Sequence, residues 1–142
     1  MKLLRAATLT VPNPEASAAR YIEWLDYDVV ERGRLSADLA AAWGTPASEG
    51  RAYVVLQPSS GAPVYLRFVA GDPVPDYRPL RTFGWAAIEI CVQDVLKVNE
   101  RMLNSPFEII GPPREIDGLP AIYPMQVKGP DGEIVYLTQI RS

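Results

Sequence analysis

The sequence predicts an α+β protein made of two tandem modules, each with the order strand, helix, strand, strand, strand. A proline-rich stretch, 71–79, divides the chain near its middle. Proline cannot donate a backbone hydrogen bond, so this stretch is predicted to be a connector. On both sides of it a short alternating strand runs into Asn13 or Asp94, which are residue types that cap helices.

The two halves also match each other at both ends. Residues 6–13 align with 87–94 at an offset of 81, and 64–66 align with 135–137 at an offset of 71. The turns before the second pair of segments keep that same offset of 71. We therefore predict a single domain over residues 1–142, with modules at about 4–71 and 84–141 and a linker at 72–83.

The elements of the first half follow from capping residues and from the spacing of apolar residues. Asn13 is the expected N-cap of a helix and Pro14 suits its first position. Residues 27–34 are read as a strand, and Ser36 and Gly44 bound a short extra helix that lengthens this half. A hairpin of two strands follows, at 51–57 and 63–69.

The second half repeats this order without the extra helix. Asp94 is the expected N-cap of a helix whose apolar residues recur at helical spacing up to Leu103. Three strands are expected after it, near 107–110, 122–127 and 134–140.

Composition excludes several classes of chemistry. The chain has no histidine, which removes Ser-His-Asp and Cys-His catalysis and histidine-ligated metals. Its net charge of −3 gives no basic footprint for nucleic acid, and its single cysteine, Cys91, cannot form an intrachain disulfide. No signal peptide or membrane-spanning apolar run is recognised, so we expect a soluble cytoplasmic protein without a cofactor.

This pattern resembles the vicinal oxygen chelate superfamily, which contains glyoxalases, bleomycin-resistance proteins and extradiol dioxygenases. The strand that enters each helix and the hairpin at 129–137 carry the resemblance, which extends from about residue 5 to 140. It implies that the two mixed sheets curl into one cup around a ligand, with the helices outside. It also implies a homodimer.

The resemblance places the usual metal ligands of the family at Ala6, Tyr65, Ala87 and Tyr136. Alanine has no donor atom, and neutral tyrosine is a poor ligand for a divalent cation. We therefore expect no metal at these four positions.

Side chains two apart in a strand share a face, so strand alternation predicts which residues line the cup. The set suits an uncharged or aromatic molecule. Val64, Leu66 and Phe68 are expected to face the core, and Trp43 could fold over the cup as a lid. Asp26, Asp28 and Glu31 are expected to be solvated. The expected cup residues are Ala6, Thr8, Tyr65, Arg67, Ala87, Glu89, Tyr136 and Thr138.

Two functions remain open at this point. The first is a metal-free protein of the bleomycin-resistance type that binds a small apolar or aromatic molecule. The second is a metal-independent isomerase, epimerase or lyase, with Glu89 as general base and Tyr65 or Tyr136 as hydrogen-bond donor. Glu89 could instead form an ion pair with Arg67 or stand at a solvated mouth. Relocated metal ligands are a third, less favoured reading.

Overall fold

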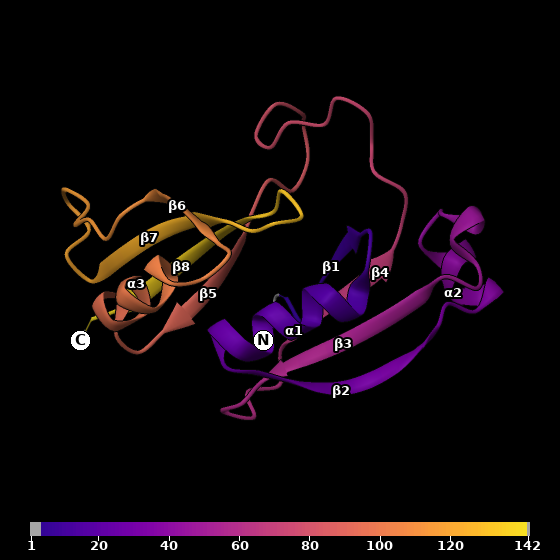
Figure 1. The fold of residues 1–142 in the computed structure, drawn as a ribbon, viewed down its shortest axis with the longest axis horizontal. Coiled ribbons are helices and arrows are strands. Elements are labelled where there is room, and N and C mark those ends of the chain that lie inside the picture. The colour runs from indigo at the N-terminus through magenta and orange to yellow at the C-terminus, as the bar shows by residue number, and fades with distance from the viewer. Residues whose placement is uncertain (1–3, 142) are drawn as a thin grey trace. The chain divides into compact units, whose positions relative to one another are not determined.

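A computed structural model describes residues 4–141, and the chain divides between Pro75 and Asp76 into two compact units. Each unit contains one four-stranded mixed sheet, and neither sheet is closed. The predicted α+β class and the two tandem β-α-β-β-β modules are confirmed (Figure 1). None of the described helices is long and apolar enough to cross a membrane.

The first unit contains a sheet with the strand order β1-β4-β3-β2. β1 runs parallel to β4, and the other neighbours are antiparallel. The predicted extra helix is present between β2 and β3 (Figure 1). The elements are β1 (Ala6–Val11), α1 (Pro14–Leu25), β2 (Tyr27–Arg34), α2 (Ala37–Ala42), the 3-10 turn η1 (Pro46–Ser48), β3 (Ala52–Pro58) and β4 (Tyr65–Ala70).

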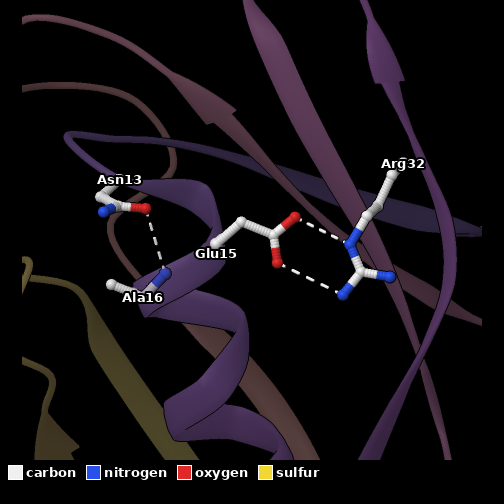
Figure 2. Close-up of polar contacts among 4 residues, drawn as sticks. All are labelled: Asn13, Glu15, Ala16 and Arg32. Carbon is white, nitrogen blue, oxygen red and sulfur yellow. Dashed lines mark hydrogen bonds and ion pairs between the residues drawn. The ribbon is translucent and has the colours of Figure 1, made fainter.

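The ends of α1 are set by local chemistry. The Asn13 side chain accepts a hydrogen bond from the Ala16 amide at 3.1 Å, as the sequence predicts. Beside this cap, Glu15 accepts two hydrogen bonds from Arg32 of β2 (Figure 2). Both partners are exposed, so solvent screens this pair and it contributes little to stability.

The core of the first unit lies between α1 and the sheet. The helix packs against β2, β3 and β4. Tyr21 and Phe68 are fully buried, and their ring centroids lie 5.0 Å apart in an edge-to-face arrangement. Leu56 and Leu66 are buried as well. Because α1 covers this face, the side chains that alternate with the core residues lie on the opposite face of the sheet.

The second unit repeats the plan with the strand order β5-β8-β7-β6. Asp94 caps its helix by accepting from two backbone amides at 3.1 Å. Met102, Val127 and Leu137 are among its buried core residues. The elements are β5 (Ile88–Val92), α3 (Val95–Leu103), β6 (Glu108–Gly111), β7 (Ile122–Lys128) and β8 (Ile134–Ile140).

The strand registers of the two units correct the prediction that Tyr65 and Tyr136 occupy equivalent positions. Tyr65 pairs with Ala6, whereas Tyr136 pairs with Glu89, which aligns with Thr8 at the offset of 81. Thr8 itself pairs with Arg67, so Tyr136 corresponds to Arg67 rather than to Tyr65.

The cause is a longer turn in the first hairpin. Gly61 and Gly132 both have positive φ, so the two glycines occupy equivalent positions and the predicted offset of 71 holds at the turns. β4 then begins four residues after its glycine, but β8 begins two residues after its own. Val64 is consequently outside the strand and 40% exposed, so its predicted place in the core is wrong.

Candidate functional site

The candidate site lies on the face of the first sheet that α1 does not cover. Strand register builds this face in rows across the sheet. One row places Thr8, Arg67, Val55 and Glu31 side by side on β1, β4, β3 and β2. The next row toward the start of β1 pairs Ala6 with Tyr65. The sequence-predicted residues Ala6, Tyr65, Arg67 and Thr8 are thus neighbours on one surface.

A cavity of about 440 Å³ is formed on this face. Apolar side chains make part of its wall, and two arginines, a glutamate and a glutamine supply polar groups. This mixture is typical of small-molecule sites. Of the predicted site residues, Ala6, Tyr65 and Arg67 line it. The full lining is Arg5, Ala6, Val30, Glu31, Val55, Gln57, Tyr65 and Arg67.

Glu31 is exposed on β2, as the sequence predicts, and it also lines this cavity. The ladder between β2 and β3 shifts between Val29 and Glu31, which is a β-bulge. Val30 is the extra residue, and both it and Glu31 line the cavity. Alternation alone cannot place two successive residues on one wall, so the sequence pattern misses this pair.

The Glu31 carboxylate is held by Tyr53, which donates a hydrogen bond to Glu31 Oε1. This bond raises the pKa of Tyr53 above its usual value, and partial burial and the charge of Glu31 add to the effect. Gly33 leaves room for the ring, since a methyl group there would lie 2.7 Å from the Tyr53 hydroxyl oxygen. The sequence contains no motif that predicts this arrangement.

Arg67 is held by an aromatic ring. Its guanidinium carbon lies 5.1 Å from the centre of the Trp43 ring, within the range of a cation–π contact. Trp43 is the C-cap residue of α2 and is about one-third exposed. The Arg67 Nε is buried and has no hydrogen-bond partner among the described residues. Trp43, which the sequence analysis considers as a lid over the cup, contacts the cavity residue Arg67.

The second unit brings together the other predicted residues. Glu89 and Tyr136 are direct neighbours on β5 and β8, and Thr138 donates a hydrogen bond of 2.7 Å to Glu89 Oε1. Thr138 is buried, whereas Glu89 is exposed. Ala87 directly precedes β5 and is half-buried.

The chemistry of the implied ligand positions does not fit a divalent metal. Ala6 and Ala87 have no donor atom, and a phenol hydroxyl such as that of Tyr136 is a poor ligand for a divalent cation. By register the fourth position is Arg67, and a guanidinium repels a cation. Within residues 4–141, no group of three or more carboxylate or thiol side chains is placed to hold a metal ion.

Comparison with known proteins identifies the fold. No protein-family model and no curated protein matches this sequence. Among solved structures, a glyoxalase family protein from Bacillus cereus is similar over 100% of this chain and 97% of its own, with 13% identity and a TM-score of 0.73.

Two further solved structures agree. A glyoxylase/bleomycin resistance protein/dioxygenase domain from Frankia sp. EAN1pec matches 99% of each chain at 16% identity, with a TM-score of 0.73. A glyoxalase family protein from Enterococcus faecalis matches 96% of this chain and 97% of its own at 18% identity, with a TM-score of 0.71. The chain therefore has the vicinal oxygen chelate fold of the glyoxalase/bleomycin resistance/dioxygenase superfamily.

Proposed function

We propose that this protein is a metal-independent binder of a small aromatic or apolar molecule, which it holds in the cavity of the first unit. The observation that carries the proposal is the cavity itself. Its volume of about 440 Å³ falls within the range of small-molecule sites, roughly 300–1,000 Å³. Tyr65, Val55 and Val30 offer apolar contact area, and Gln57 offers a hydrogen-bonding amide.

We also propose that the protein acts in the cytoplasm. Its one cysteine, Cys91, is a free and exposed thiol. Exposed thiols persist in compartments that keep cysteine reduced, which supports this placement.

The binding proposal is tested with 2-naphthamide, a neutral aromatic probe, in a titration followed by amide NMR shifts. We expect the shifts to concentrate at Ala6, Val55 and Tyr65. Tyr65→Ala should weaken binding by about two- to tenfold, because it removes a ring contact worth roughly 0.5–1.5 kcal/mol. Tyr123→Ala, at a half-buried tyrosine of the second unit that does not line the cavity, is the matched control. An equal loss in both variants, or shifts that avoid the cavity residues, would contradict the proposal.

We propose that the chain assembles as a homodimer. Five large apolar side chains are exposed between residues 74 and 85, and Phe83 and Trp85 are almost completely so. Exposed large apolar side chains this close in sequence are candidates for an interaction surface. The residues are Val74, Tyr77, Leu80, Phe83 and Trp85.

Sedimentation equilibrium checks the dimer. At micromolar concentration we expect twice the chain mass of 15.7 kDa. The double variant Phe83→Ser/Trp85→Ser should shift the protein to the monomer, whereas Leu119→Ser, an exposed residue elsewhere, should not. A wild-type monomer would sink the proposal.

A second candidate function is a metal-independent isomerase, epimerase or lyase. The pairing of Glu89 with Tyr136 on adjacent strands favours it, because a carboxylate base and a phenol donor then stand side by side. Tyr65, the other donor considered, lies in the first unit.

Phenylpyruvate, an aromatic 2-oxo acid with exchangeable hydrogens, tests this candidate. Deuterium exchange should run above the buffer rate and fall by about 10²–10⁴-fold in Glu89→Gln. Glu100→Gln, an exposed carboxylate on α3, should leave the exchange unchanged. Exchange at the buffer rate in the wild type would rule the candidate out.

A further inference from the structure

We infer that the molecule held in the first-unit cavity is an aromatic acid, with its carboxylate bound by Arg67 and its ring against Tyr65. This inference rests on the proposed function, because it assigns a chemical class to the ligand of that same cavity. Four features of the cavity carry it.

The first feature is an unsatisfied donor. Arg67 lines the cavity, and its Nε is buried without a hydrogen-bond partner among the described residues. Buried donors in native proteins are almost always paired, so one that remains unpaired calls for an explanation. A carboxylate in the guanidinium plane would accept from Nε and from the terminal nitrogen on the same edge, as arginine–carboxylate pairs commonly do.

The second feature is the absence of a competing anion. In the described part of the first unit, Arg67 forms no ion pair. Glu31 is the carboxylate in the same cavity, but Val55 lies between the two residues in the row across the sheet. Two strand spacings separate their backbones by roughly 10 Å. The Glu31 carboxylate already accepts a hydrogen bond from Tyr53.

The third feature is the way Arg67 is positioned. The Trp43 ring, 5.1 Å from the guanidinium carbon, holds the side chain through its π face. A contact with a ring face leaves the in-plane N–H groups of a guanidinium available to a ligand. Arg67 is also fixed at its base, because β4 is paired on both sides by β1 and β3. Such a side chain loses little freedom when it binds an anion.

The fourth feature is the charge of the cavity wall. Arg5 and Arg67 are positive and Glu31 is the single negative residue, so the lining carries a net charge of +1. Both arginines belong to the β1–β4 side, where Arg5 directly precedes Ala6 and the Arg5 carbonyl accepts from the Tyr65 amide. An anionic group is therefore favoured beside Tyr65. The ring of the same molecule can then lie against Tyr65 and Val55.

The matched probes 2-naphthoate and 2-naphthamide test the inference, since they share a ring and differ in charge. We expect 2-naphthoate to bind at least about tenfold more tightly. Its binding should also move the Arg67 Nε–H signal in a nitrogen–proton NMR spectrum, whereas 2-naphthamide should leave that signal in place. Arg67→Met should remove the preference for 2-naphthoate, so that the two probes bind with equal affinity.

Arg32→Met is the control, because it removes the same charge from an exposed residue that faces Glu15 outside the cavity (Figure 2). It should leave the preference for 2-naphthoate unchanged. Equal affinities of the two probes, or a preference that survives Arg67→Met, would overturn the inference while the proposed function stands. Failure of both probes to bind would overturn the proposed function and the inference together.

Discussion

Phe68→Ala is expected to lower the free energy of unfolding by about 3–5 kcal/mol. Phe68 is fully buried on β4, and its ring meets Tyr21 of α1 edge-to-face at 5.0 Å. Its removal takes away this ring contact between α1 and β4 and leaves a cavity that a close-packed core cannot fully close. The loss is a large part of a typical total stability, roughly 5–15 kcal/mol.

Urea unfolding followed by far-UV circular dichroism measures this effect. Leu119→Ala is the control, because it removes an apolar side chain from an exposed position outside the proposed dimer surface. The control should change stability by no more than about 0.5 kcal/mol. Equal losses in the two variants would mean that Phe68 does not anchor the core between α1 and the sheet.

Phe68 connects this core to the candidate site. Its neighbour Arg67 points to the opposite face of β4, because successive strand residues alternate. The strand is therefore packed on one face and lines the cavity on the other. A binding group based on a well-packed central strand is held more precisely than one on a loop.

Much of the fold could be predicted because its signals are local. Asn13 and Asp94 cap their helices as expected, and Gly44 has the positive φ that a left-handed stop requires. Alternation correctly assigned Leu66 and Phe68 to the buried face. Each of these features depends on a few adjacent residues and on the elementary preferences of the backbone.

The site was harder to predict because it depends on register. The offset between the two hairpins is 71 at their turns, but it changes by two where β4 and β8 begin. The residue that corresponds to Tyr136 is therefore Arg67 and not Tyr65. A shift of two keeps each residue within the strands on its predicted face, so the hydrophobic pattern does not reveal the shift. The sequence predicts which face of the sheet a strand residue occupies, but it does not predict which residues on the neighbouring strands lie beside it.

The bulge at Val30 and the contact between Trp43 and Arg67 also could not be predicted, because neither has a local sequence signal. A bulge adds one residue to a strand without a characteristic sequence, and it turns Glu31 into the cavity. Trp43 and Arg67 are distant in sequence, and they meet because the end of α2 lies near the face of the first sheet that α1 does not cover. Long-range contacts of this kind determine which charges in the cavity stay unpaired.

Filling the cavity is expected to have the largest effect on binding. Ala6→Trp places an indole on β1 beside Tyr65, where the probe ring is proposed to lie. We expect 2-naphthamide affinity to fall by a factor on the order of 100, equal to about 2.7 kcal/mol. Ala6 is exposed and β1 is an edge strand, so the new side chain meets no packed core. Stability should therefore change by no more than about 0.5 kcal/mol.

Ala47→Trp adds the same side chain to an exposed residue of the same unit that does not line the cavity, and its binding should equal that of the wild type. The comparison separates occupation of the cavity from a general effect of one more aromatic group. If Ala6→Trp bound the probe as well as Ala47→Trp does, the ligand would lie elsewhere, since an indole at position 6 and a naphthalene ring beside Tyr65 cannot share the same space.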